Sequence, residues 1–150
     1  MFKRALLGII FITSLSGCEV PVMMAAKANQ GEMVGMFEIK FPAVLLVQIE
    51  DGTEELLKGH LLGHINGSAK FDLTGPTWGE CTGASTKAGK TSLSCANGIS
   101  LSMNTGKQKA KMSGLNVVAG QSLGHKFISA FGWGNDADEA KARLALEEHS

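Results

Sequence analysis

The segment "ASTKAGKT", residues 84–91, has the spacing of a nucleotide phosphate-binding loop: a small residue, four further residues and then Gly-Lys-Thr. Such a loop needs a buried parallel strand before it and a helix after it, because backbone N–H groups at the start of the helix hold the phosphate. No continuous Val/Ile/Leu run precedes this segment, and "TSLSCANG" at its end alternates with period two and reaches a turn. We therefore interpret it as a hairpin turn made by residues 87–90, with Gly89 as the turn residue, and we expect no nucleotide binding.

His60 and His64 are four residues apart, a spacing that would let them share a metal ion on a helix. Gly59 and Gly63 argue against a helix, and on a strand the two side chains would lie about 13 Å apart. We expect surface histidines and no metal site. No serine follows the nucleophile-elbow pattern, so we expect no catalytic residue, although a triad assembled in space stays open.

The chain begins with "MFKRALLGIIFITSLSGC", a short basic region followed by an apolar run that is shorter than the roughly 20 residues of a membrane-spanning helix. Its end, Leu15-Ser16-Gly17-Cys18, resembles the lipobox of bacterial lipoprotein precursors. The resemblance implies that residues 1–17 are a signal peptide, that Cys18 carries lipid and an acyl group such as palmitate, and that the chain is membrane-anchored. An ordinary secretory leader with a chance cysteine is the alternative.

Glu19 follows the cysteine, where Asp would be the usual signal for retention in the inner membrane. We therefore expect the protein at the cell outer membrane, facing the periplasm. Residues 18–32 contain Pro21 and no strand alternation, and we interpret them as a flexible tether. A single domain is expected over residues 33–150.

With Cys18 lipidated, Cys81 and Cys95 are the one remaining pair of cysteines. In an oxidising compartment they are expected to form a disulfide bond. Two cysteines at this spacing lack the rest of a zinc ligand set.

The domain is predicted to be mainly β: an antiparallel meander, small barrel or sandwich. Two strand-like runs, 35–41 and 43–50, flank Pro42, which marks an edge, bend or bulge. The next segment, "TEELLKGHLL", fits either a short helix or a strand. From Gly59 onward, short alternating runs are separated by Gly or Asn-Gly at intervals of roughly ten residues.

Two hairpin registers can be predicted by requiring apolar side chains to share one face. In "TSLSCANGISLSM" a three-residue loop, 96–98, pairs Leu93 with Leu101. The same requirement applied to "LGHINGSAKFDL" pairs Gly63 with Phe71.

A short C-terminal helix is expected at about 136–148. Asp136 and Glu139 fit the N-cap and N3 positions of a capping box, and the segment is rich in good helix formers. The apolar stripe expected to face the sheet is Ala137, Ala140 and Leu144.

Five aromatic residues are expected in the core or at the ends of a barrel: Phe71, Trp78, Phe127, Phe131 and Trp133. Lys107, Lys109 and Lys111 stand at alternate positions, which on a strand would place them on one face. They form either a solvated face that discourages edge pairing or a contact face for an acidic partner or anionic headgroup.

The charge is balanced, with 14 basic and 14 acidic residues, and no basic patch predicts nucleic-acid binding. The domain is similar to small Gly-rich β domains of exported bacterial proteins, a likeness that implies no activity. We expect an envelope lipoprotein that acts as a non-catalytic binding or interaction module, without a cofactor, for an envelope protein or a small ligand. An inhibitor of an envelope-directed hydrolase such as lysozyme is the alternative, because small β-barrel lipoproteins with that activity are similar in size, anchor and disulfide use. A small hydrolytic enzyme is the third possibility.

Overall fold

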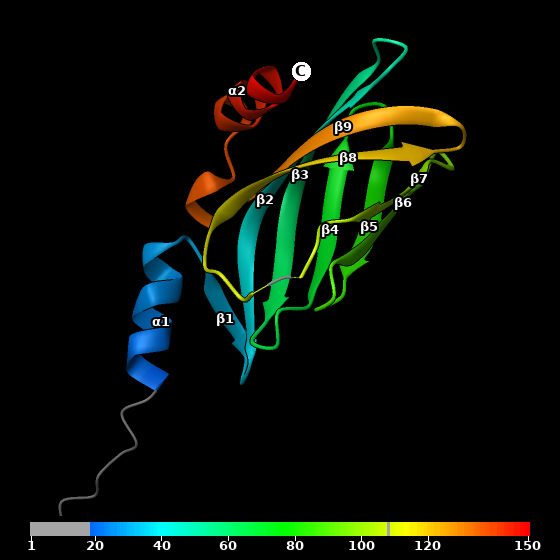
Figure 1. Ribbon diagram of the computed structural model, residues 1–150. Helices are drawn as coiled ribbons and strands as arrows, with labels where there is room; N and C mark the ends of the chain where they lie inside the picture. The colour runs from blue at the N-terminus through cyan, green and yellow to red at the C-terminus, as the bar shows by residue number, and fades with distance from the viewer. Residues whose placement is uncertain (1–18, 108) are drawn as a thin grey trace, which may run out of the picture.

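The computed structural model describes residues 19–107 and 109–150, so the expected signal peptide, residues 1–17, and Cys18 lie outside the described residues. The chain forms a nine-stranded antiparallel sheet that curls into a nearly closed barrel, with one helix before it and one after it (Figure 1). The elements are α1 (Glu19–Ala28), β1 (Glu32–Gly35), β2 (Glu38–Ile49), β3 (Glu54–His64), β4 (Ala69–Gly75), β5 (Gly79–Ser85), β6 (Lys90–Cys95), β7 (Ser100–Asn104), β8 (Gly114–Ser122), β9 (His125–Trp133), η1 (Gly134–Asp136) and α2 (Glu139–His149). The mainly β fold with a C-terminal helix is confirmed.

The strands follow one another in space in the order β7-β6-β5-β4-β3-β2-β9-β8, with β1 paired to β2 beside β9. Strands β7 and β8 are therefore the two edges that approach each other. At one end, the Ser122 hydroxyl donates a hydrogen bond to the Ser100 carbonyl oxygen across this gap. The segment "TEELLKGHLL", for which the sequence fitted either a helix or a strand, belongs to strand β3.

Strand β2 runs without interruption through Pro42, which corrects the expectation of two separate runs. Pro42 faces His60 of β3 on one side. On the other side, the pairs with β1 end at Lys40 and those with β9 begin at Ala43. The proline thus lies between two partners, where its missing N–H removes no ladder bond.

Several hairpins share a three-residue loop whose last residue is a left-handed glycine, as at Gly67 (φ 90°) and Gly98 (φ 91°). The segment that resembles a nucleotide loop is one of them, because the Thr86 N–H donates to the Lys90 carbonyl and closes a hairpin between β5 and β6. It is the predicted turn.

The predicted pairing of Leu93 with Leu101 is confirmed. The pairing of Gly63 with Phe71 is wrong by two residues, since Gly63 pairs with Ala69. The loop there consists of residues 65–67, because Gly67 is the residue that adopts the left-handed conformation. This shift decides which side chains lie next to one another inside the barrel.

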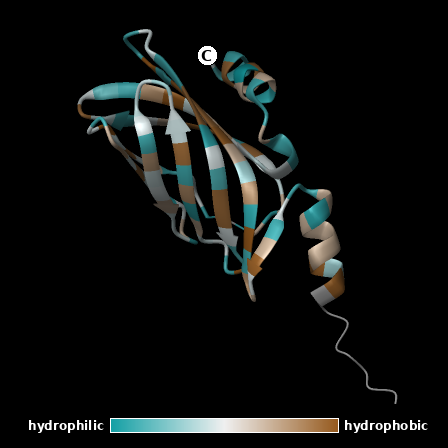
Figure 2. Cartoon of the chain, turned by 180° about the vertical axis from the view of Figure 1, so that it is seen from behind, coloured by the Kyte–Doolittle hydropathy of each residue, from teal (hydrophilic) through white to brown (hydrophobic). Residues whose placement is uncertain are grey.

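Apolar and polar residues alternate along the strands (Figure 2), so the sheet has an inner and an outer face. The inner face holds the larger core cluster. Helix α2 covers part of the outer face, where Leu46 of β2 and Ala130 of β9 pack against the helix. Strand β2 is consequently buried on both faces over residues 43–47.

Helix α2 begins two residues later than the predicted capping box would place it. Asp138, not Asp136, is the N-cap, and its carboxylate accepts a hydrogen bond of 2.9 Å from the Lys141 N–H. The later start rotates the helix, so the predicted stripe is wrong. The buried residues of α2 are Ala142, Ala145 and Leu146, whereas Leu144 is exposed.

Ion pairs at the surface link α2 to strand β3, beside the apolar residues that the helix covers on the outer face of the sheet. The Arg143 guanidinium lies 2.6 Å from a Glu54 carboxylate oxygen and 3.0 Å from one of Glu139. Arg143 and, to a lesser extent, Lys58 lower the pKa of Glu139 below its ordinary value. These exposed pairs orient the helix, and each is expected to contribute at most about 1 kcal/mol to stability.

Residues 19–28 form helix α1, which corrects the interpretation of residues 18–32 as flexible coil. Pro21 lies in the first turn, where its missing N–H leaves no helical bond unmade. Ala26 is buried, and the Asn135 side chain donates a hydrogen bond of 3.0 Å to the Ala28 carbonyl. The C-terminal half of α1 is therefore part of the folded body. Within the described residues, neither helix has the length and apolar character needed to cross a membrane.

Candidate functional site

The barrel has two different ends, set by the alternating direction of its strands. The connections β1–β2, β3–β4, β5–β6 and β7–β8 lie at one end, which we call the open end. The connections β2–β3, β4–β5, β6–β7 and β8–β9 lie at the other, which we call the closed end.

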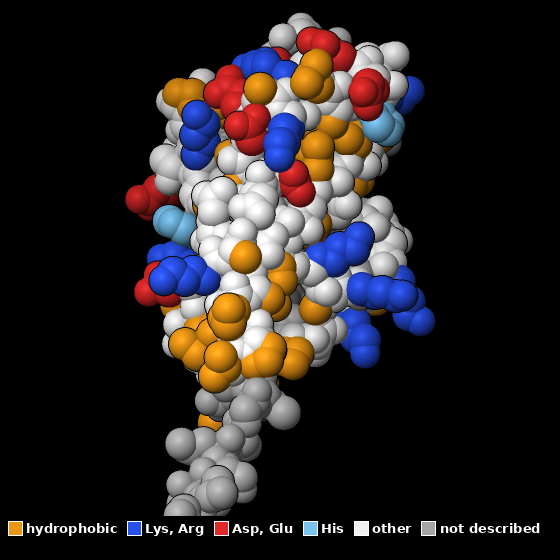
Figure 3. All heavy atoms as spheres, turned by 90° about the vertical axis from the view of Figure 1, so that its left-hand side faces the viewer, with side chains coloured by type: hydrophobic (Ala, Val, Ile, Leu, Met, Phe, Trp, Pro, Cys, Tyr) orange, Lys and Arg blue, Asp and Glu red, His pale blue; other side chains and the backbone are white. Residues whose placement is uncertain are grey.

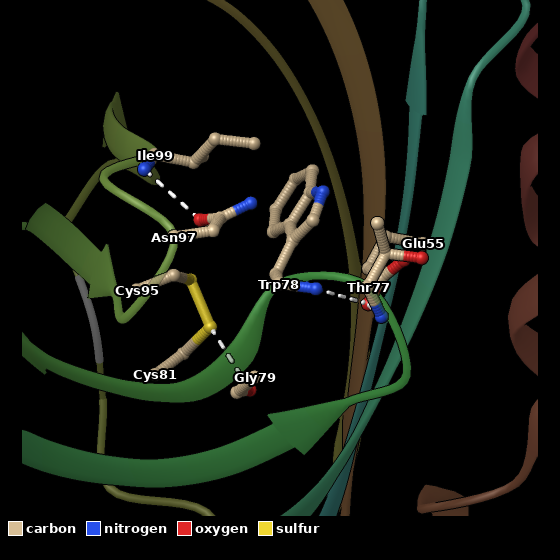
Figure 4. Close-up of a disulfide and its surroundings, with 8 residues drawn as sticks. All are labelled: Glu55, Thr77, Trp78, Gly79, Cys81, Cys95, Asn97 and Ile99. Carbon is tan, nitrogen blue, oxygen red and sulfur yellow. Dashed lines mark hydrogen bonds between the residues drawn. A yellow bond between two sulfur atoms is a disulfide. The ribbon is translucent and has the colours of Figure 1, made fainter.

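Trp78 fills the closed end (Figure 4). It follows β4 in the turn to β5 and is 2% exposed. Its backbone N–H and that of Thr77 donate hydrogen bonds of 2.9 and 2.8 Å to one oxygen of Glu55, which is itself only 2% exposed. The predicted disulfide between Cys81 and Cys95 is confirmed beside this turn and joins β5 to β6. The closed end is thus packed and cross-linked.

The open end is hollow. A cavity of about 570 Å³ enters the barrel there, within the roughly 300–1,000 Å³ range of small-molecule sites. Large apolar side chains form its walls, chiefly Phe41, Leu45, Leu61, Phe71, Leu93 and Trp133. The predicted barrel aromatics divide between the two ends, because Phe131 and Trp133 line the cavity while Phe127 and Trp78 do not.

Small side chains on adjacent strands account for this hollow. The inward row nearest the open end runs between Ile39 on β2 and Met103 on β7. Across β3 to β6 it consists of four small residues, Gly63, Ala69, Ser85 and Thr91, which are paired in that order. All four line the cavity. The next inward row contains Leu61 and Phe71 and fills its space. The cavity therefore follows directly from the residue sizes and the observed register.

The polar groups of the cavity wall bond to one another. The Ser129 hydroxyl donates to the Val118 carbonyl at 3.1 Å, and the Thr91 hydroxyl donates to Ser85 at 2.8 Å. Among the described residues, no buried side-chain nitrogen or oxygen lacks a hydrogen-bond partner. The buried part of a ligand would consequently meet hydrocarbon, and a polar group placed there would lose its bonds to water.

Lys107, Lys109 and Lys111 lie in the connection between β7 and β8, which corrects their placement on a strand. The strand ends because the Asn104 side chain accepts a hydrogen bond of 3.0 Å from the N–H of Gly106, a local turn that competes with sheet pairing. Lys109 and Lys111 line the mouth of the cavity. The Lys111 carbonyl also accepts a bond of 3.1 Å from the Trp133 indole, which fixes this loop to the wall.

The histidines of the sequence are not brought together. His60 is exposed on the outer face of β3, and His64 lies at the open end with its Nδ1 3.4 Å from a Glu38 oxygen. Within the part of the chain that the structure describes, no three His, Cys, Asp or Glu side chains gather as a metal site would require.

Glu55 was not identified as important from the sequence, although a signal for it exists. It stands two residues before Leu57 in β3, at a position where alternation requires an inward side chain. A charged residue at an inward position is buried only when its hydrogen bonds are satisfied. Here two backbone N–H groups satisfy it.

Comparison of the chain with protein-family models, with curated proteins and with solved structures gives no match in any of the three. Inferences about function therefore depend on the geometry of the cavity and on the N-terminal sequence that precedes the barrel.

Proposed function

We propose that the protein is a bacterial envelope lipoprotein, anchored through Cys18 at the periplasmic face of the outer membrane, that binds a small apolar molecule in its barrel without catalysis. The observation that carries the proposal is the cavity of about 570 Å³, closed at one end and open at the other. Its wall offers apolar contact and few polar groups, an arrangement suited to holding a ligand rather than transforming it.

The position of the chain before the barrel supports an anchor at the open end. Cys18 is one residue before α1, and Val22 in the first half of α1 lines the cavity. A lipid on Cys18 would therefore hold the mouth, and not the packed closed end, near the membrane. Several acyl chains on one residue would make this anchoring stable.

The anchor is tested by metabolic labelling with a palmitate analogue. We expect wild-type protein to be labelled and to fractionate with membranes, and Cys18→Ala to lose both properties. Cys81→Ser is the matched control, because it removes a cysteine that the structure places in a disulfide and should keep the label. Label that persists in Cys18→Ala would overturn the lipoprotein assignment.

The cavity is tested with parinaric acid, a fatty acid whose fluorescence rises in apolar surroundings. Ala69 lines the cavity beside Gly63, so Ala69→Phe should fill the space and weaken binding about tenfold. Ala84→Phe is the matched control, since Ala84 is exposed on the neighbouring strand β5 and pairs with Lys70 on the outer face. Equal titration curves for wild type and Ala69→Phe would refute the cavity as the binding site.

A further inference from the structure

The apolar wall of the cavity continues onto the outer surface of the protein. Four residues both line the cavity and are exposed to solvent, and we call them the apolar rim: Val22, Met36, Phe37 and Ile65. They come from α1, the β1–β2 turn and the β3–β4 loop. Three further exposed residues of α1 extend this surface: Val20, Met23 and Met24.

The space-filling view shows apolar side chains gathered at the end of the molecule beside α1, with basic side chains to either side (Figure 3). Monomeric proteins rarely expose a large continuous apolar patch unless something docks there. The apolar rim surrounds an opening, so whatever covers it also faces the cavity.

Charge at the same end favours an anionic surface. Lys109 and Lys111 line the mouth, and Lys107 is exposed in the same loop. A Glu38 carboxylate oxygen at the same end lies 3.4 Å from the His64 Nδ1. Basic residues beside an apolar patch are the combination that binds an anionic lipid bilayer, with hydrocarbon inserted and lysines at the headgroups.

The predicted anchor brings a bilayer to this end. Cys18 directly precedes α1, and α1 carries part of the exposed apolar surface. A lipid on Cys18 would hold that surface next to the membrane at a high effective concentration, so even a weak contact would be occupied.

We propose that the apolar rim docks on the membrane surface, so that the cavity opens into the bilayer and receives the acyl chain of a lipid without the chain crossing water. This inference rests on the proposed function and adds the source and class of the ligand. The lysines of the β7–β8 connection would then contact the anionic headgroup, while the acyl chain lies against the apolar wall.

Docking is tested without the covalent lipid. The chain from residue 18 with Cys18→Ser keeps every residue that the structure describes, and its flotation is measured with phosphatidylcholine vesicles with and without phosphatidylglycerol. We expect binding to both, with stronger binding to the anionic vesicles. Changing Met36 and Phe37 to serine should weaken binding to both vesicle types about tenfold, because the buried apolar area is lost.

The matched control changes Leu123 and Leu144 to serine. Leu123 is 77% exposed, as is Met36, but it lies in the turn at the closed end, and Leu144 lies on α2. This control should bind vesicles like wild type, and an equal loss would overturn docking through the rim. Changing Lys107, Lys109 and Lys111 to glutamine should weaken binding about tenfold on anionic vesicles only.

Transfer is tested by supplying parinaric acid within the vesicles and following the quenching of tryptophan emission, to which Trp133 in the cavity wall contributes. The Met36/Phe37 variant should load about tenfold more slowly than the Leu123/Leu144 control, because its mouth no longer contacts the bilayer. Equal loading rates would overturn the inference.

The failures of the two proposals differ. Ala69→Phe keeps the apolar rim, so it should bind vesicles normally and parinaric acid about tenfold more weakly. Met36 and Phe37 line the cavity only at its exposed edge, so the rim variant should lose much more vesicle binding than fatty-acid binding in solution. Cys18→Ser protein with the native rim that binds the fatty acid and ignores vesicles would refute docking alone, and the same protein binding vesicles but no fatty acid would refute the proposed function.

Discussion

Trp78→Ala is expected to lower the free energy of unfolding by about 4 kcal/mol, the loss typical of deleting a buried aromatic side chain. Trp78 is among the largest fully buried side chains in the described structure and closes one end of the barrel between the disulfide and Glu55 (Figure 4). Its removal would leave a void that the neighbouring disulfide and the turn prevent from collapsing. The loss is measured by urea unfolding, followed by far-UV circular dichroism so that the missing indole does not affect the signal.

Two further variants test whether the loss of stability in Trp78→Ala comes from lost packing at the closed end. Trp78→Phe retains much of the packed volume and should recover more than half of the loss. Phe37→Ala removes an aromatic side chain that is exposed at the open end and should change stability by no more than about 0.5 kcal/mol. A loss below about 1 kcal/mol for Trp78→Ala would show that the closed end does not depend on this side chain.

The parts of the fold that depend on local pattern could be predicted from the sequence. Period-two alternation indicates strands, left-handed glycines indicate tight turns, and a hairpin turning near Gly89 places Cys81 opposite Cys95. These features involve residues close together in the chain, so composition and spacing are sufficient to identify them. The C-terminal helix was predicted for the same reason, although Asp138 rather than Asp136 caps it.

The cavity could not be predicted, because it depends on which inward residues become neighbours across several strands. In the predicted register Gly63 faces Phe71, and a large ring fills the space beside the glycine. In the observed register Gly63 faces Ala69, which faces Ser85, so small residues coincide and the space stays open. A shift of two residues keeps every side chain on its expected face, so alternation alone cannot detect it.

The β7–β8 connection, which carries the three lysines, and helix α1 were mispredicted for a different reason. Alternate lysines are compatible with a strand, but the hydrogen bond from the Gly106 N–H to the Asn104 side chain ends β7 before they begin. Residues 19–28 lack strand alternation, and Pro21 suggested a coil although it fits the first turn of a helix. Both segments contribute to the open end, Val22 of α1 to the apolar rim and Lys109 and Lys111 to the mouth, so this part of the site depends on elements that strand alternation does not identify.

A second large effect is expected at Glu55. Glu55→Ala should lower the free energy of unfolding by about 3 kcal/mol, because the backbone N–H of Trp78 would lose its acceptor while buried and that of Thr77 while partly buried. The turn between β4 and β5 would then be held less firmly, and Trp78 would loosen with it. Urea unfolding gives the stability, and a red shift of tryptophan emission reports the exposure of the indole.

Glu55→Gln separates the hydrogen bonds from the charge. Its amide oxygen can accept from the same two N–H groups, so we expect a loss of only about 1 kcal/mol. Glu54→Ala is the matched control on the same strand, because Glu54 forms an ion pair with Arg143 at the surface and should contribute less than about 1 kcal/mol. Equal losses for Glu55→Ala and Glu54→Ala would contradict this role. The expected ranking would show that one inward carboxylate holds the turn that carries Trp78, and so keeps the barrel packed at one end while it is hollow at the other.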